Sequence, residues 1–171
     1  YYEHVIVNKT LSLVGENNHD TIIQGNGTGV TVCLIANNVI LSDFAIQNSY
    51  LGIWFRDSSK NNVTNNIISN TSYGLYLWAA SDNTITGNNA SNNYTGIYLE
   101  NSSNNIFVGN AFSSNTYAGI RIEYSSNNIF AGNAFSSNTY TGIRVISSSN
   151  NILTGNNASN NENGIHLELS N

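Results

Sequence analysis

The sequence has no proline, no methionine, a single cysteine and few charged residues. With one cysteine, no internal disulfide can form. Charged residues make up 9% of the chain and the formal net charge is -5, which excludes the basic surface that nucleic acids and anionic membranes require. No apolar run reaches the roughly 18 residues of a membrane-spanning helix. The sequence therefore predicts neither a nucleic-acid partner nor insertion into a membrane.

The missing proline and methionine lead to further expectations. A proline would remove a ladder hydrogen bond from a stacked strand, so its absence suits a sheet protein. The chain starts at Tyr1 rather than at a methionine and contains no methionine at all, which predicts a processed or excised segment of a longer polypeptide. Cys33 lies between Val32 and Leu34 in an apolar run, where we expect a small buried side chain rather than a nucleophile.

The most prominent feature of the sequence is an internal repeat. The block GIYLENSSNNIFVGNAFSSNTYA from Gly96 is followed by the nearly identical GIRIEYSSNNIFAGNAFSSNTYT from Gly119, and a weaker copy starts at Gly29. A glycine before an apolar-x-apolar triplet recurs at spacings of 22, 22, 23, 23 and 22 residues, at Gly52, Gly74, Gly96, Gly119, Gly142 and Gly164. With 40% hydrophobic residues, the chain is expected to fold as one domain over 1–171, less regular over 1–51 and regular over 52–171.

Each repeat alternates with period two in short bursts separated by Asn, Ser and Gly, which is typical of strands and turns. A leucine-rich repeat has a similar period but needs a leucine-rich consensus that is absent. We therefore predict an all-β parallel β-helix, a solenoid of about seven coils of 22–23 residues with three strands per coil. The inward columns are expected to be Ile53/Phe55 and its equivalents up to Ile165/Leu167, then Val63, Ile85, Phe107, Phe130 and Leu153, then Ile68, Ala90, Phe112, Phe135 and Ala158.

An asparagine recurs between the last two inward columns. Stacked coils would place these amides about 4.8 Å apart, so that each donates to the carbonyl of the next. Such an asparagine ladder satisfies buried polar groups at the turn. Its expected members are Asn66, Asn88, Asn110, Asn133 and Asn156.

The GIxL…SSNNxxxxNxxxxN coils and the opening YYEHVIVNKTLSLVGENNHDTIIQGNGTG resemble the parallel β-helix repeats of the NosD-like and pectate-lyase-like superfamily of archaeal and bacterial proteins. The resemblance covers essentially the whole chain and implies a right-handed β-helix and an exported protein. Members range from polysaccharide lyases and hydrolases to surface-layer proteins, so the fold alone does not settle activity.

The copper role of a NosD-like protein would require a cluster of soft or imidazole ligands. The chain offers His4, His19, His166, one cysteine and no methionine. We therefore expect no metal site and no cofactor.

The outward face of the first strand holds the best candidates for chemistry. Glu100 and Glu123 would stack one strand spacing apart beside Arg121 and Arg144, close enough for a retaining glycosidase pair. Glutamate and arginine neighbours on a solvated face are more often simple charge pairs, so these four residues are weak catalytic candidates.

Four large rings are expected on the same face, namely Trp54, Tyr76, Trp78 and Tyr98. Together they form a contiguous apolar patch on which sugar rings could stack. The alternative is that a loop, a neighbouring domain or another subunit covers the patch. The prediction is a carbohydrate or partner contact.

Asparagine makes up about a fifth of the chain, and several residues stand in Asn-x-Ser/Thr sequences. These are candidate glycosylation sites wherever the turn faces outward. They are Asn8, Asn26, Asn62, Asn70, Asn89, Asn93, Asn101 and Asn157.

The chain ends within a first strand, at Ile165-His166-Leu167-Glu168-Leu169, without a capping element. This predicts either flanking domains of a longer chain or head-to-tail stacking of subunits. The expected function is a non-catalytic, extracellular or cell-surface structural module of a sheath or filament that contacts glycans. The alternatives are a polysaccharide lyase or glycosidase, and a carbohydrate-binding adhesion module.

Overall fold

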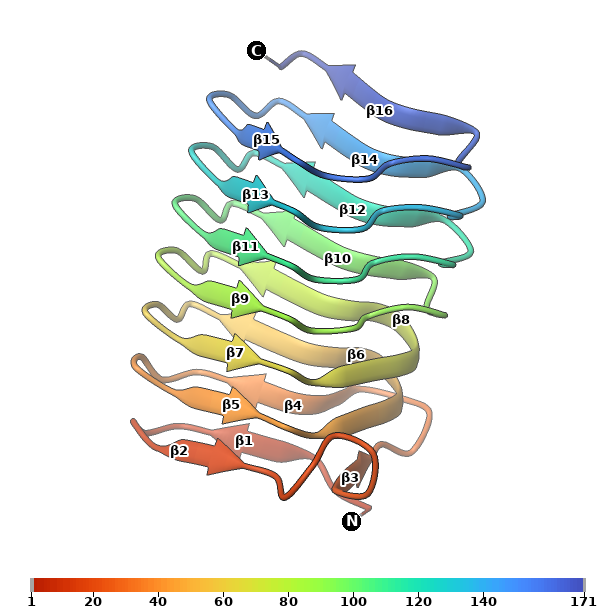
Figure 1. Ribbon diagram of the computed structural model, residues 1–171. Coiled ribbons are helices and arrows are strands. Elements are labelled where there is room, and N and C mark those ends of the chain that lie inside the picture. The colour runs from red at the N-terminus through yellow and green to blue at the C-terminus, as the bar shows by residue number, and fades with distance from the viewer. Residues whose placement is uncertain (1, 171) are drawn as a thin grey trace.

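The chain forms a right-handed parallel β-helix of about seven coils, with its ends at opposite ends of the stack (Figure 1). The computed structural model describes residues 2–170, and every regular element in that range is a strand. No helix among these residues is long and apolar enough to span a membrane. The predicted fold class is confirmed.

Two parallel sheets run the length of the solenoid. Nine strands form the first, here called sheet A, and seven form the second, sheet B. The strands of sheet A are β1 (Val5–Val7), β3 (Ile22–Gln24), β4 (Val30–Leu34), β6 (Ala45–Arg56), β8 (Ile67–Trp78), β10 (Thr95–Glu100), β12 (Ala118–Glu123), β14 (Thr141–Ile146) and β16 (Asn163–Glu168). The strands of sheet B are β2 (Ser12–Val14), β5 (Ile40–Ser42), β7 (Asn62–Thr64), β9 (Thr84–Thr86), β11 (Ile106–Val108), β13 (Ile129–Ala131) and β15 (Ile152–Thr154).

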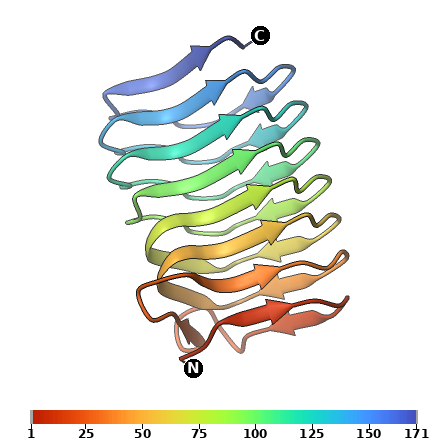
Figure 2. The same cartoon turned by 180° about the vertical axis from the view of Figure 1, so that it is seen from behind.

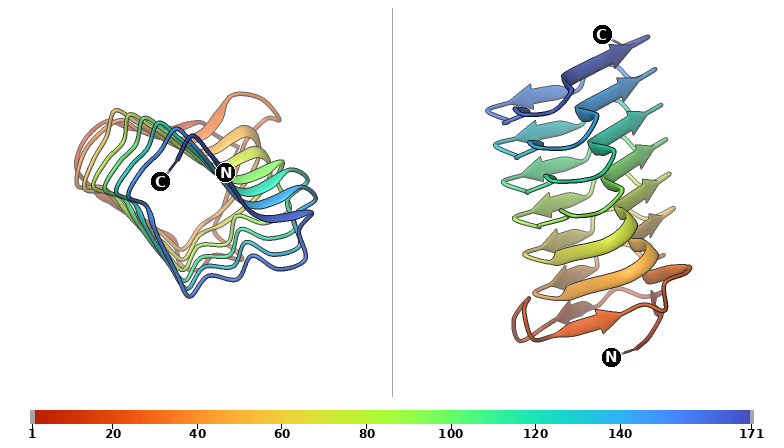
Figure 3. Two further views of the ribbon diagram at one scale, coloured as in Figure 1. Left: turned by 90° about the horizontal axis from the view of Figure 1, so that it is seen from above. Right: turned by 90° about the vertical axis from the view of Figure 1, so that its right-hand side faces the viewer.

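The third strand of the coil is complete only near the N-terminus. There it is formed by β3 and by the first halves of β6 and β8, which continue into sheet A without a break. In later coils the third face pairs through one bridging residue each, at Asn89, Ala111, Ala134 and Asn157. Seen from above, successive coils have similar outlines, each displaced slightly from the one before (Figure 3).

In the hydrophobic core, equivalent side chains of successive coils lie above one another and form columns along the solenoid. Ile53 pairs in register with Leu75, and Phe107 stacks on Phe130 with ring centroids 4.7 Å apart. The predicted inward columns are confirmed, and nearly all their members are fully buried. The exception is the last coil, where Ile165 and Leu167 of β16 are 54% and 60% exposed. End-to-end stacking on this coil stays a prediction.

The predicted asparagine ladder is present, with each amide bonding to the next along Asn66, Asn88, Asn110, Asn133 and Asn156. Two further ladders, which were not predicted from the sequence, line two other turns. One contains Asn61, Asn83, Asn105, Asn128 and Asn151, and the other Asn93, Asn115, Asn138 and Asn161. In all three, the side-chain oxygen accepts the backbone N–H of the preceding coil, so the turns of successive coils are locked in register.

Candidate functional site

The outward side of sheet A, in front in Figure 2, carries the candidate site. Two outward columns run along it, because their members are Cα partners in successive strands. The first column is Trp54, Tyr76, Tyr98, Arg121, Arg144 and His166. The second column is Arg56, Trp78, Glu100, Glu123, Ile146 and Glu168.

The aromatic residues of the first column stack on one another. The Trp54 and Tyr76 rings lie 6.3 Å apart at 9°, and the Tyr76 and Tyr98 rings 5.1 Å apart at 13°. Parallel rings in a file partly cover each other's faces, so a sugar could reach the edges of Tyr76 more easily than its faces. The Tyr98 ring is also covered by Arg121, whose guanidinium carbon lies 4.9 Å from the ring centre. At the other end of the file, the guanidinium carbon of Arg56 lies 5.2 Å from the centre of the Trp54 ring.

Tyr73 extends the aromatic surface sideways. Its ring contacts Tyr76 at 6.0 Å, Tyr98 at 5.6 Å and Tyr50 at 5.7 Å. Tyr73 was not predicted from the sequence because it stands directly before a glycine, one residue away from the position of Tyr50 in the repeat. Its side chain joins the Trp54 file to Tyr50 of β6.

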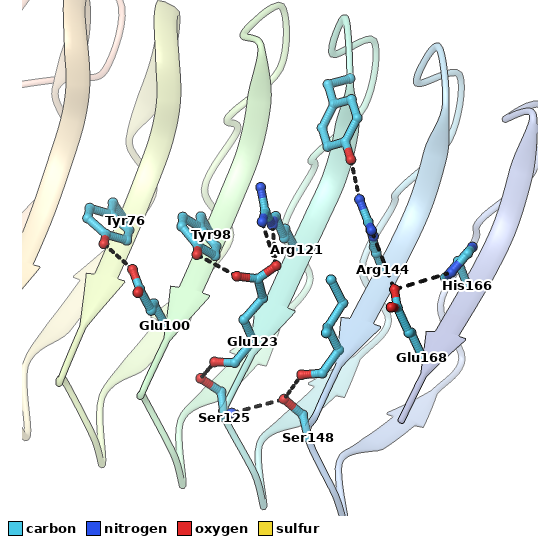
Figure 4. Close-up of polar contacts among 12 residues, drawn as sticks. Tyr76, Tyr98, Glu100, Arg121, Glu123, Ser125, Arg144, Ser148, His166 and Glu168 are labelled. Carbon is cyan, nitrogen blue, oxygen red and sulfur yellow. Dashed lines mark hydrogen bonds and ion pairs between the residues drawn. The ribbon is translucent and has the colours of Figure 1, made fainter. Parts of the chain in front are cut away.

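The two candidate catalytic carboxylates belong to Cα partners on β10 and β12, and both are already engaged (Figure 4). The Tyr76 hydroxyl donates to Glu100 at 2.5 Å, and the Tyr98 hydroxyl donates to Glu123 at 2.8 Å. Arg121 Nε donates to the other Glu123 oxygen at 2.7 Å. Each carboxylate therefore holds a neighbouring side chain in place.

Burial and these contacts raise the pKa of both phenols. Burial, followed by the hydrogen bond to Glu100, raises the pKa of Tyr76 far above its ordinary value. Burial and the Glu123 bond raise the pKa of Tyr98 in the same way. Both phenols stay protonated in neutral and mildly alkaline solution, so they act as hydrogen-bond donors and not as bases.

Arg144, the other weak catalytic candidate, belongs to a separate group in the last coils (Figure 4). Its guanidinium donates to the Tyr117 hydroxyl at 2.5 Å and lies 3.5 Å from Glu168. His166 lies 4.0 Å from the same Glu168 carboxylate. None of these contacts joins Arg144 to the carboxylate of Glu100 or Glu123.

Two hollows flank Trp54. One, of about 260 Å³, lies between Trp54, Arg56, Tyr76 and Trp78. The other, of about 380 Å³, lies on the N-terminal side, where Trp54 and Arg56 face Ile6 and Cys33. The Cys33 thiol is half-buried there, not fully buried as predicted, because position 33 points outward from β4. All four predicted ring residues are half-buried, and three of them line the first hollow.

Seven of the eight glycosylation candidates are exposed in the structure, so glycosylation at Asn8, Asn26, Asn62, Asn70, Asn89, Asn101 and Asn157 stays a prediction. The prediction at Asn93 is wrong. Asn93 is 3% exposed, and its amide donates to the Ile68 carbonyl at 3.0 Å within a ladder. A glycan cannot be attached there without removing the ladder contact.

The fold defines a right-handed parallel β-helix protein. More particularly, the chain belongs to the NosD family, because the family model described as periplasmic copper-binding protein (NosD) matches residues 12–171. No curated protein matches the chain.

Several solved structures share the fold. The gp42 tailspike of Acinetobacter phage vb_AbaP_AS12 is 12% identical with a TM-score of 0.77, and the match covers 96% of this chain and 37% of the tailspike. The periplasmic alginate epimerase AlgG is 18% identical with a TM-score of 0.67, over 96% of this chain and 46% of the epimerase. An alginate lyase from Paenibacillus sp. str. FPU-7 is 10% identical with a TM-score of 0.59, and the match covers 95% of this chain and 84% of the lyase. At these identities the likeness shows the fold alone, and the chain spans less than half of the first two.

The donor set of this chain does not fit the copper site that the family description implies. Copper prefers thiolate, thioether and imidazole ligands in close groups. The chain has no methionine and one cysteine, and within residues 2–170 no three His, Cys, Asp or Glu side chains are grouped to hold a metal ion.

Proposed function

We propose that this chain is a non-catalytic β-helix module of a periplasmic, cell-surface, sheath or filament protein that binds a polysaccharide on sheet A. The site is centred on Trp54, where two hollows and the aromatic file meet. The continuous aromatic surface is the observation that carries the proposal. Large half-exposed rings on a rigid sheet offer contact area to a sugar at little cost in conformational entropy.

The comparisons support this proposal at the level of the fold. The family description names a periplasmic protein, and the similar structures include a phage tailspike, a periplasmic alginate epimerase and an alginate lyase. The family description and the name of the epimerase each refer to a periplasmic protein. The names of the epimerase and the lyase each refer to alginate, a polysaccharide. A rigid solenoid that presents side chains in straight files suits an extended polymer, because equivalent contacts repeat along its length.

A non-catalytic role is favoured by the contacts of the carboxylates. A general acid or nucleophile must reach the glycosidic bond, whereas Glu123 is 9% exposed and bonded to both Tyr98 and Arg121. Glu100 is bonded to Tyr76. Breaking these bonds would leave charged or polar groups without partners at a half-buried site, at a cost of about 1–3 kcal/mol each.

The proposal is tested by replacing Trp54 with alanine. We expect affinity for the best oligosaccharide of a panel to fall about 30-fold, corresponding to about 2 kcal/mol for a central aromatic contact. Binding is followed by tryptophan fluorescence for the unmodified chain and by calorimetry for both variants. The control is Tyr124→Ala, which also removes an aromatic ring, at an exposed position after β12 outside the file. Equal affinities for the two variants would contradict the proposal.

Polysaccharide degradation is the second candidate function, favoured by the adjacent Glu100 and Glu123 on β10 and β12. It predicts that a polymer is shortened or an unsaturated product appears, and that Glu100→Gln or Glu123→Gln stops the reaction. Incubating the same panel with the chain and sizing the polymers decides between the two functions. Polymers that keep their length support the binding role.

A further inference from the structure

Arg56, at the end of β6, stands apart from the other arginines of the stripe. It lines both hollows beside Trp54, and its guanidinium carbon lies 5.2 Å from the centre of the Trp54 ring. Its nearest acidic contact joins Nε to Asp57 Oδ2 at 4.0 Å, with the two side chains 53% and 60% exposed. A pair this long and this exposed neutralises little of the arginine charge.

The other two arginines are occupied. Arg121 Nη2 lies 2.5 Å from Glu123, and Arg144 bonds to Tyr117 and pairs with Glu168. A ligand would have to displace these partners before it could use either guanidinium. Arg56 can bind a new anion without breaking a short ion pair.

The charge along the second outward column changes sign. Arg56 is followed by Trp78, then by Glu100 and Glu123 in the next two strands. None of the described residues that line the two Trp54 hollows is acidic. An anionic group is therefore favoured at the Arg56 end of the file and repelled at the Glu100 end.

From this arrangement we infer that the Trp54 site takes a sugar unit bearing an anionic group, a carboxylate or a sulfate, with Arg56 as its specificity-determining residue. The inference rests on the proposed glycan-binding function and adds the ligand class. The planar guanidinium can donate two parallel hydrogen bonds to such a group, while Trp54 and Trp78 contact the apolar face of the ring. Trp54 separates the two hollows, so Arg56 can reach an anion on either of two successive sugar units.

Cys33 supplies an independent readout of the Arg56 charge. Burial raises the pKa of the Cys33 thiol above its ordinary value, and the positive charge of Arg56 offsets part of that rise. Removing the Arg56 charge should therefore shift the pH profile of Cys33 alkylation to higher pH. A bound anionic sugar should shift the profile in the same direction and further than a bound neutral sugar, because the neutral sugar adds burial of the thiol without offsetting the Arg56 charge.

The test compares oligosaccharides of equal length on the intact chain: an oligo-uronate, a sulfated oligosaccharide and a neutral cello-oligosaccharide. We expect the better of the two anionic ligands to bind at least about 10-fold more tightly than the neutral one at low salt, and to lose this advantage at high salt. Arg56→Gln should abolish the advantage, because it weakens anionic binding about 10-fold and neutral binding much less. Arg56→Lys should retain part of it, because lysine keeps the charge without the planar fork. The control is Lys60→Gln, which removes an exposed charge outside the hollows.

The possible failures are distinguishable. If neutral and anionic ligands bind equally and Trp54→Ala weakens both, the glycan site stands and the Arg56 inference is wrong. If Arg56→Gln weakens all ligands equally, Arg56 is a general contact and the inference is again wrong. If no oligosaccharide of any kind binds, the proposed function and the inference both fall. The inference is supported if Arg56→Gln loses the anionic preference and the control Lys60→Gln keeps it.

Discussion

Replacing Asn110 with leucine should destabilise the fold by roughly 2–6 kcal/mol, since two buried polar groups lose their partner at about 1–3 kcal/mol each. The Asn110 side-chain oxygen accepts the backbone N–H of Asn88 at 2.9 Å, and its amide nitrogen donates to the Ile85 carbonyl at 2.9 Å. Leucine has a similar shape but can make neither bond. Denaturant unfolding followed by circular dichroism measures the loss.

The control for the ladder is Asn62→Leu on β7. Asn62 is exposed, and its side-chain oxygen accepts a hydrogen bond from the Thr64 hydroxyl of the same strand at 2.8 Å. We expect a change within about 0.5 kcal/mol at this surface position. A loss at Asn110 no larger than that at Asn62 would mean that the ladder contributes specificity of register but no net stability.

Gly119→Ala should destabilise the fold by about 3 kcal/mol, more than Gly109→Ala, although Gly109 and not Gly119 has a positive φ. A Cβ on Gly119 would lie 2.7 Å from the Gly142 carbonyl oxygen and 2.8 Å from the Phe112 carbonyl oxygen. Both are backbone atoms of neighbouring strands and turns that cannot move without disturbing the stack, and overpacking of this kind costs about 1–3 kcal/mol or more.

Gly109 provides the matched comparison. Its φ is +63°, and a Cβ at this residue would have no other atom within 4 Å. Alanine there should cost only about 1–2 kcal/mol for the left-handed backbone. Gly109→Asn should cost less, because asparagine already adopts this conformation at Asn104 and Asn127. Thermal unfolding of the three variants ranks them, and a larger loss at Gly109 than at Gly119 would show that backbone conformation outweighs the close contact.

The ladder and the glycine column explain why the stripe on sheet A is straight. From β6 on, each coil is held to the next at three turns by asparagines, and successive strands approach so closely at the glycines that no side chain fits. Outward side chains such as Trp54 and Tyr76 therefore stay in file across several coils. Such straight files are what the proposed binding of an extended polymer requires.

The sequence by itself determined the fold, the register, the inward columns and one of the three ladders, since a 22–23-residue period puts equivalent residues above one another in any β-helix. It identified Asn66 to Asn156 as a ladder and placed Trp54, Tyr76 and Tyr98 in one file. These conclusions need only strand alternation and the repeat length.

Only the tertiary structure decided which neighbouring groups each side chain of a file contacts. It showed that Glu100 and Glu123 are held by tyrosines and Arg121, that Asn93 is a ladder residue, and that Arg56 keeps its charge available. These properties depend on rotamers, burial and contacts between adjacent coils. Residues that occupy equivalent positions in the repeat differ in those contacts, so periodicity cannot predict them.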